Sequence, residues 1–180
     1  MSNSKKTTSE INRLSLENFK LKQKIDIKIV LDNLRSGLNI GSIFRTADAF
    51  NIKKIYITGI SAVPPNKEIV KTALGATESV DWEYVKNPVD LIQILKEEGD
   101  HIYAIEQTLN SLSLEDFRYE KNESITLIFG NEVEGVNQDL IDLCHGSIEI
   151  PQFGTKHSLN VSVTAGIVIW HLVNQNLKEL

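Results

Sequence analysis

Short runs rich in β-branched residues alternate along this chain with segments whose apolar residues recur every three or four positions. The runs lie at 25–31, 55–58, 80–84, 101–105, 124–129 and 147–150, and the helical segments at 40–50, 88–98, 137–143 and 159–177. Another helical stretch begins near Lys67. Such alternation predicts an α/β fold with a mostly parallel sheet flanked by helices on both faces. Residues 1–20 are expected to add an N-terminal helix capped by Thr8 or Ser9.

The composition is that of a single globular domain. The 180 residues are 41% hydrophobic and 24% charged, which is close to the average for such domains. A chain of this length buries roughly 70% of its unfolded surface, which is enough for a hydrophobic core without a metal ion or a disulfide bond to stabilise it. With one cysteine, Cys144, a polar N-terminus and no run near the ~18 apolar residues of a membrane span, we expect a cytoplasmic protein without membrane attachment.

Charge is distributed unevenly along the chain. The formal net charge of -5 argues against nucleic-acid binding, because neutralisation of phosphates supplies most non-specific affinity. Lysine and arginine nevertheless prevail in the first 54 residues, whereas acidic residues cluster at 97–100 and 115–120. These runs are either binding surfaces or solvated faces, and charge alone does not choose between them.

The last helical segment is apolar on nearly every side between Ile167 and Val173. A helix of this kind must be covered all round. One face can pack on the sheet, and the other is expected to meet the same helix of a second subunit, with Ile169 and Val173 on that outward face. The alternative is that loops of the same chain cover it. Trp82 and Trp170 are expected in the core.

Common catalytic signatures are missing. The sequence contains no GxxxxGKS, GxGxxG, HExxH or CxxC, which disfavours nucleoside triphosphate, dinucleotide and zinc chemistry. We therefore predict no metal site.

Three polar or glycine-containing stretches follow predicted strands, at the sheet edge where open α/β folds bind ligands. They span residues 31–50, 127–136 and 148–166. In the first, Arg45 is placed one turn into a helix, close to an end that attracts anions, so it is a candidate phosphate clamp. Asn39 and Ser158 could equally be helix caps, and Glu132 a surface carboxylate. Arg45 on an apolar helix needs a partner if it is buried.

Within these stretches, NIGSIFRTADAF, FGNEVEG and IPQFGTKHSLNVSVTAG resemble the three ordered motifs of the SpoU/TrmH family of S-adenosylmethionine-dependent RNA 2'-O-ribose methyltransferases, in the SPOUT class. The resemblance spans residues 25–175. It implies a C-terminal deep trefoil knot, an obligate homodimer packed through the C-terminal helix, and S-adenosylmethionine bound in the knot loops. The chain would then divide into a basic helical extension, 1–24, and a methyltransferase domain, 25–180.

The resemblance also implies a set of site residues. The catalytic positions fall on Asn39, Arg45, Glu132, Ser158 and Asn160, and the cofactor-binding positions on Gly130, Ile150 and Leu159, with Glu106 and Gln107 closing the pocket. Lys156 and His157 depart from the family pattern and receive no role.

Methyl transfer to a ribose 2'-hydroxyl requires alignment of oxygen, methyl and sulfur and stabilisation of charge on a poor nucleophile. Arg45 would clamp the neighbouring phosphate and stabilise the 2'-oxygen, since a guanidinium is a poor base. Asn39 would orient Arg45 or the ribose, and Asn160 would hold Asn39 or Glu132. Glu132 and Ser158 would brace the loops.

The function expected from these features is RNA 2'-O-methylation. Members of the resembled family with a short basic extension like residues 1–24, and without a large extra RNA-binding domain, often act on tRNA, so the resemblance favours tRNA over rRNA as the substrate. Two alternatives stay open: a non-catalytic RNA-binding dimer with the same fold, and an enzyme that uses the same cofactor on another acceptor.

Overall fold

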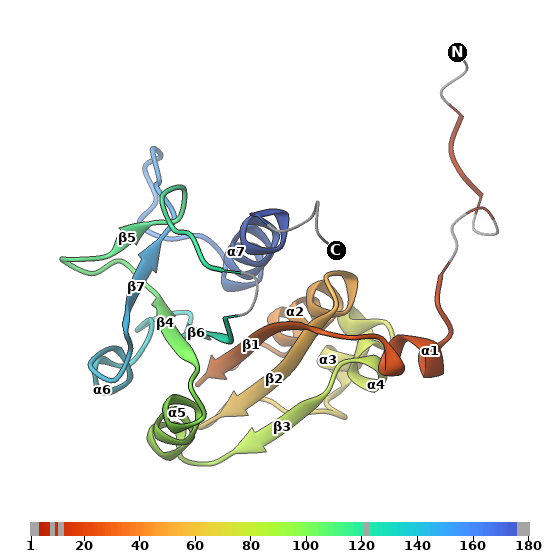
Figure 1. Cartoon of the computed structure of the whole chain (residues 1–180), viewed down its shortest axis with the longest axis horizontal. Coiled ribbons are helices and arrows are strands. Elements are labelled where there is room, and N and C mark those ends of the chain that lie inside the picture. Colours follow the sequence, from red (N-terminus) through yellow and green to blue (C-terminus); the bar gives the residue numbers. More distant parts are fainter. Residues whose placement is uncertain (1–3, 8–9, 11–12, 121–122, 176–180) are drawn as a thin grey trace.

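A computed structural model describes residues 4–7, 10, 13–120 and 123–175. Its strands are β1 (Ile25–Asp32), β2 (Ile52–Thr58), β3 (Trp82–Val85), β4 (His101–Ile105), β5 (Leu112–Ser113), β6 (Ile125–Phe129) and β7 (Gly146–Glu149). They form one seven-stranded sheet in the order β3-β2-β1-β6-β4-β7-β5, and each pairing between these strands is parallel (Figure 1). The predicted α/β class is therefore confirmed, and the sheet is parallel throughout the described residues.

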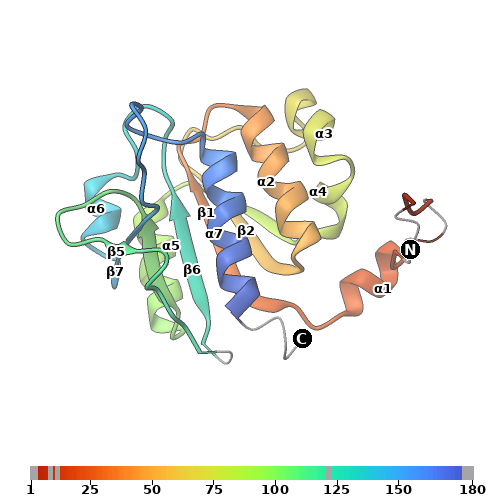
Figure 2. The ribbon, with the colours of Figure 1, turned by 90° about the horizontal axis from the view of Figure 1, so that it is seen from above.

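Helices cover both faces of this sheet. They are α1 (Leu16–Leu21), α2 (Gly37–Ala49), α3 (Lys67–Ala73), α4 (Ala76–Ser79), α5 (Pro88–Glu97), α6 (Gln138–Ile141) and α7 (Val161–Gln175). The larger core lies between the sheet and α2, α3, α4 and α7, while α5 and α6 pack over the other face. Figure 2 shows α2 between α7 on one side and α3 and α4 on the other.

The strand order places four loops at one edge of the sheet. The chain builds outward from β1 through β2 to β3 and then crosses to β4 on the other side of β1. A crevice opens at such a reversal, outside the carboxyl ends of the strands. The segments that follow β1, β4, β6 and β7 meet there, and they include the three stretches identified in the sequence.

The N-terminal helix is shorter than predicted. Among the described residues 4–7, 10 and 13–24, the α-helical ones are Leu16–Leu21; the N-cap of this helix is Ser15, whose hydroxyl accepts a hydrogen bond from the Asn18 N–H. The predicted caps, Thr8 and Ser9, lie outside the described residues. Residues 4–7 and 13–15 are not helical, because a sparse apolar set gives a short helix too little tertiary packing to stabilise it.

Helix α7 is buried on one side and open on the other. Ala165, Val168, Ile169, Leu172 and Val173 are buried in the core. The predicted outward positions Ile169 and Val173 are therefore wrong. An exposed stripe runs instead along Val163, Ile167 and Trp170, which are 50%, 39% and 48% exposed. Trp170 is thus not a core residue, and the described loops leave this stripe uncovered.

Trp82, the other tryptophan assigned to the core, is half-buried and contacts Phe44 edge to face, with ring centroids 6.4 Å apart. A two-residue edge strand, β5, escaped prediction because it is too short to show a period. None of the helices described has both the length and the apolar character required to cross a membrane.

Candidate functional site

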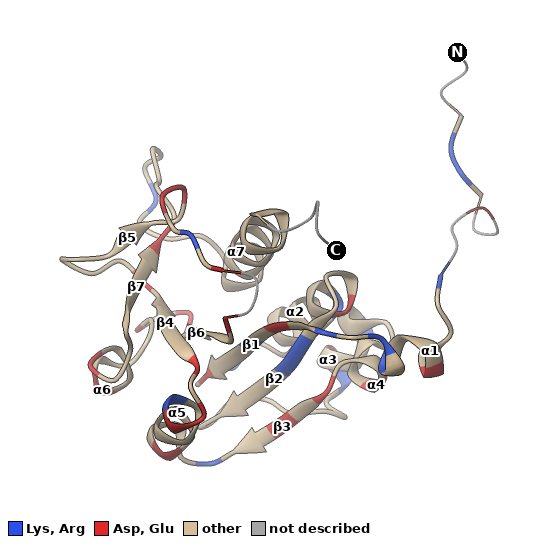
Figure 3. Cartoon of the chain, viewed as in Figure 1, with Lys and Arg blue, Asp and Glu red and all other residues tan. Residues whose placement is uncertain are grey.

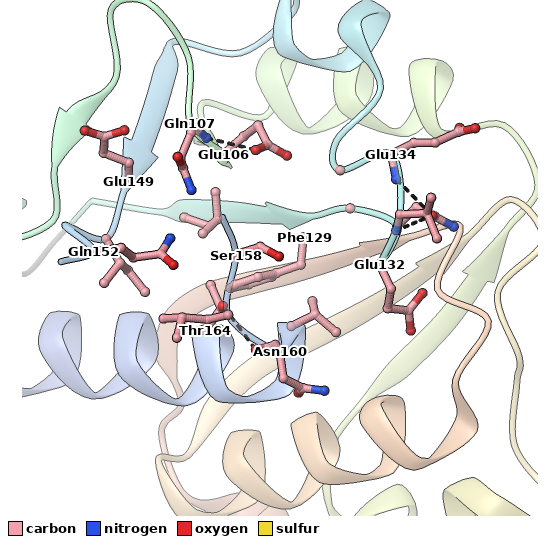
Figure 4. A pocket seen from close by; sticks show the side chains of 18 of the residues that line it. Glu106, Gln107, Phe129, Glu132, Glu134, Glu149, Gln152, Ser158, Asn160 and Thr164 are labelled. Atoms are coloured by element: carbon pink, nitrogen blue, oxygen red, sulfur yellow. Dashed lines mark hydrogen bonds between the residues drawn. The ribbon is translucent and has the colours of Figure 1, made fainter. Parts of the chain in front are cut away.

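A cavity of about 490 Å³ opens at the carboxyl ends of β4, β6 and β7 (Figure 4). Its lining comes from four segments: residues 105–107 at the end of β4, residues 129–135 at the end of β6, residues 148–150 and Gln152 at the end of β7, and residues 158–161 with Thr164 at the start of α7. Gly130, Glu132, Ile150, Ser158, Leu159 and Asn160, all predicted site residues, lie in this wall, as do Glu106 and Gln107. Asn39 and Arg45 do not line it.

Glu106 and Gln107 join the loops around the cavity. The Glu106 carboxylate accepts hydrogen bonds from the backbone N–H of Val136 (3.0 Å) and of Gln107 (2.9 Å). The side chain of Gln107 donates to the His157 carbonyl at 2.9 Å. The end of β4 is therefore tied to the loop after β6 and to the loop after β7, which sets the width of the cavity.

The loop after β6 is a tight turn that depends on glycine. Asn131 and Gly135 exchange two backbone hydrogen bonds of 2.9 Å, and Gly135 has φ 72°, a conformation that favours glycine. A side chain at Gly130 would collide with the backbone of Gly135 and Val136. Gly130 is thus required for packing within the loop, in addition to any close approach of a ligand.

The side chains of Glu132, Asn39 and Asn160 form a chain of hydrogen bonds at the rim of the cavity. Nδ2 of Asn39 donates to Glu132 at 3.1 Å, and Nδ2 of Asn160 donates to Oδ1 of Asn39, also at 3.1 Å. One residue from each of the three sequence stretches takes part. Asn39 is free for this role because Ser36, and not Asn39, caps α2, accepting a hydrogen bond from the Asn39 N–H at 3.3 Å.

Asn160 has a second task as the cap of α7. Its Oδ1 accepts hydrogen bonds from the Ser162 N–H (2.9 Å), the Ser162 hydroxyl (2.6 Å) and the Val163 N–H (3.4 Å). Ser158, predicted as a cap, lies three residues before the first helical residue and faces the cavity (Figure 4). Both side-chain groups of Asn160 are therefore committed, one to the helix and one to Asn39.

Glu132 is held as a carboxylate. Desolvation alone would raise its pKa, but hydrogen bonds from its own N–H, from Asn39 and from the N–H groups of Ser36 and Arg35 outweigh that effect and lower the pKa. An ionised Glu132 accepts from the start of α2 and so fixes that helix relative to the loop after β6.

Arg45 lies elsewhere. Helix α2 begins at Gly37, so that Arg45 is in its third turn and not beside its N-terminus. The side chain is exposed, so it does not require the partner that a buried arginine would need, and it lines a separate groove with residues of α3. Within the described residues, Arg45 makes no side-chain hydrogen bond or ion pair.

The charges of the cavity are all of one sign. Its lining contains the carboxylates of Glu106, Glu132, Glu134 and Glu149 and no lysine, arginine or histidine. Such a wall suits a ligand with positive charge and does not by itself neutralise a phosphate. Glu134, Glu149 and Gln152 were not singled out in the sequence, although each lies inside one of the three stretches.

Comparisons with known proteins agree with this architecture. The profile of the SpoU rRNA Methylase family matches residues 26–170. A Borreliella burgdorferi protein described as an uncharacterized tRNA/rRNA methyltransferase is 34% identical over 176 residues, covering 96% of this chain and 74% of that protein. The tRNA (guanosine(18)-2'-O)-methyltransferase of Thermus thermophilus is 28% identical, covering 94% and 86%.

Among solved structures, an AdoMet-bound rRNA methyltransferase from Sinorhizobium meliloti superimposes with a TM-score of 0.78 at 25% identity. The match covers 88% of this chain and 60% of that one. This chain thus spans less than two thirds of the Sinorhizobium protein.

Proposed function

Because the chain belongs to the SpoU methylase family, we propose that it transfers a methyl group from S-adenosylmethionine to a ribose 2'-hydroxyl of RNA. The observation that carries this proposal is the Glu132–Asn39–Asn160 chain, which joins all three sequence stretches beside one cavity. A named 2'-O-methyltransferase among the relatives supports the reaction. An AdoMet-bound structure among the similar folds supports the cofactor.

The cavity residues fit this cofactor. S-adenosylmethionine brings an electrophilic methyl group on a cationic sulfonium, together with an amino group. The four carboxylates of the wall would stabilise these positive charges, and Phe129, Ile150 and Leu159 would cover its apolar parts. Backbone groups of Gly130, Ile150 and Leu159 would contact the cofactor, and Glu106 and Gln107 would close the cavity over it.

Other side chains of this protein would bind and orient the RNA that accepts the methyl group. Arg45 would bind the phosphate beside the target ribose and stabilise negative charge that develops on the 2'-oxygen. Its guanidinium has a pKa above ~12 and does not act alone as a base. Asn39 would orient the ribose or Arg45, held by Asn160 and Glu132, and Ser158 would brace the loop it belongs to.

Within one chain Arg45 is separated from the cavity, and a second copy would remove this separation. Arg45 lies on α2, the helix that packs against α7. Phe50 at the end of α2 contacts Trp170 of the exposed stripe on α7, with ring centroids 5.7 Å apart. An exposed apolar stripe on a helix suits an interface between subunits. We propose a homodimer that packs through α7 and brings Arg45 of one copy to the cavity of the other.

The chain path near the cavity supports the predicted knot. The segment between β4 and β6 is bonded both to the end of β7 and to the end of α7: Leu114 N–H donates to the Glu149 carbonyl (2.8 Å), and the Gln175 side chain donates to the Phe117 carbonyl (2.9 Å). We propose that residues 150–175 pass through the loop 106–124 as a trefoil knot, which a crystallographic trace of both segments would test. The division at residue 24 and the cytoplasmic location stay predictions.

For the substrate we favour tRNA over rRNA. Basic residues in and just after α1 (Figure 3), Lys20 and Lys22, continue the basic N-terminal segment, and the Thermus relative is named for tRNA. Mass spectrometry of ribose-methylated nucleosides from a strain without this protein tests the proposal. A lost 2'-O-methyl nucleoside in the tRNA fraction is expected. Loss of the nucleoside from rRNA alone would indicate that rRNA is the substrate. An unchanged set of ribose-methylated nucleosides would favour the non-catalytic RNA-binding dimer.

A further inference from the structure

A second groove lies between α2 and α3. It measures about 500 Å³ and is lined by Ser42, Arg45, Thr46, Ala49, Phe50, Lys71, Thr72 and Leu74. Its only charged side chains are Arg45 and Lys71, and it contains no carboxylate. The groove is therefore positive although the chain as a whole carries a formal charge of -5. Its charge is opposite in sign to that of the cavity at the end of β6, whose charged lining residues are all acidic.

Arg45 and Lys71 are both available to a ligand. Both are exposed, and neither side chain has a hydrogen bond or ion pair to any other described residue. Many other cations of this chain are already engaged: Lys28, Lys53 and Lys54 in ion pairs, and Lys96 on the Leu143 carbonyl. The two groove cations thus share one opening and have no internal partner.

The two walls of the groove are locked together. The Thr72 hydroxyl of α3 donates to the Leu38 carbonyl of α2 at 3.0 Å. Gly41 lets the helices approach so closely that a side chain there would meet the backbone of α3 at Ile69. The backbone positions of Arg45 and Lys71 are consequently fixed relative to one another before any ligand binds, which reduces the entropy lost on binding.

The remaining polar groups of the groove indicate which kind of anion it can bind. The hydroxyls of Ser42, Thr46 and Thr72 all donate to backbone carbonyls, at 2.9, 3.0 and 3.0 Å. They have no proton left to enclose a small anion, so recognition rests on the two cations. Two cations over an open groove suit the repeating charge of a phosphodiester backbone, which is held by charge rather than by a closed cage.

We infer that Lys71 is an RNA-binding residue and that, with Arg45, it grips the phosphodiester backbone that leads to the methylated nucleotide. This inference rests on the proposed function and deepens it by adding α3 to the RNA-binding surface. Lys71 takes no part in methyl transfer itself; it positions the RNA strand on which Arg45 acts.

The test is RNA affinity as a function of salt. Bulk tRNA from cells lacking the protein is titrated with wild type, Lys71→Ala and Lys71→Arg, and fluorescence anisotropy gives the Kd between 50 and 200 mM salt. Lys67→Ala is the matched control, because Lys67 is exposed on the same helix but outside the groove. We expect Lys71→Ala to weaken binding by about fivefold and to lower the salt slope by about one. Lys71→Arg should restore most of the affinity, and calorimetric S-adenosylmethionine affinity should not change in any variant.

Two results would overturn the inference: equal RNA affinity and salt slope for Lys71→Ala and Lys67→Ala, or loss of cofactor binding in Lys71→Ala, which would indicate a structural role. The readout is binding and not turnover. A wild type that binds tRNA through Lys71 but methylates no RNA would therefore contradict the proposed function alone. A wild type that methylates RNA, but whose RNA affinity and salt slope are unchanged by Lys71→Ala, would contradict this inference alone.

Discussion

Asn160, at the start of α7, donates a 3.1 Å hydrogen bond from its side-chain amide to Oδ1 of Asn39, a residue of α2 that precedes it by 121 positions. The same Asn160 caps α7 through its Oδ1. The bond therefore links the last helix of the chain to the first helix after β1, and through Asn39 to Glu132.

Separate variants distinguish the two tasks of Asn160. Asn160→Ala removes the cap and should lower stability by about 1 kcal/mol. Asn160→Asp keeps an acceptor for the cap but replaces the donor that faces Asn39, so its stability should stay close to wild type. Both should slow methyl transfer, as measured by single-turnover kinetics beside thermal unfolding. An Asp variant with full activity would show that the link to Asn39 is dispensable.

Gly130 and Gly154 offer a matched pair in two loops at the same edge of the sheet. Gly130→Ala should disturb the loop after β6, because its side chain would collide with the backbone of Gly135 and Val136. Gly154→Ala places its side chain in open space. Calorimetry should show lost S-adenosylmethionine binding only for Gly130→Ala. Equal affinities in the two variants, both folded, would remove Gly130 from the binding site.

The exposed stripe of α7 predicts how the chain associates. Ile167→Glu places a charge on the open face and should convert a dimer to a folded monomer, whereas Ile169→Glu buries a charge and should unfold the chain. Light scattering and circular dichroism separate the two outcomes. A wild type that is monomeric at micromolar concentration would contradict the proposed dimer.

A buried ion pair at the opposite end of the sheet predicts a stability effect. Lys28 and Asp100 are both buried, with Nζ and Oδ1 2.8 Å apart. Lys28→Met keeps the volume but leaves Asp100 without its counter-charge, so unfolding should become easier by about 3 kcal/mol. Lys53→Met, which removes a partly exposed pair with Asp26, should have an effect below about 1 kcal/mol. Urea unfolding measures both, and equal effects would contradict the account.

The same pair gives a pH dependence. Desolvation would lower the pKa of Lys28, but the hydrogen bond and charge of Asp100 outweigh it and raise the pKa above its ordinary value of 10.5. A raised pKa stabilises the folded state below 10.5, and that contribution is lost as the pH rises through the folded pKa. Between pH 9 and 12 wild type should therefore lose more stability than Lys28→Met. A parallel loss in both would show that Lys28 does not account for it.

The order of strands and helices was predictable because β-branched runs and three-to-four-residue spacing report local conformation directly. Strand β4, His101–Ile105, has the predicted bounds. What local patterns do not report is which side of an element faces the core. Ile169 and Trp170 are both large hydrophobic residues, and only the packing of α7 in the fold shows that the first is buried and the second half exposed.

The motifs predicted many of the residues that line the cavity, whereas they did not predict the geometry of the cavity. Glu132, Ser158 and Asn160 lie together because parallel strands end at one sheet edge. The position of Arg45 depends on where α2 begins, and the cap at Ser36 moves that start four residues ahead of Gly41. The sequence did not mark Glu149 as a cavity residue, because a glutamate at the end of a strand, two positions before Pro151, looks like an ordinary structural residue.

The proposed activity is tested most directly by single-turnover methyl transfer with purified protein, labelled S-adenosylmethionine and tRNA from cells lacking it. Wild type should place the label on a ribose 2'-oxygen, and Arg45→Ala should be slower by at least ~10²-fold with unchanged cofactor affinity. Label on a base, label on no RNA, or an Arg45→Ala variant as fast as wild type would contradict the account.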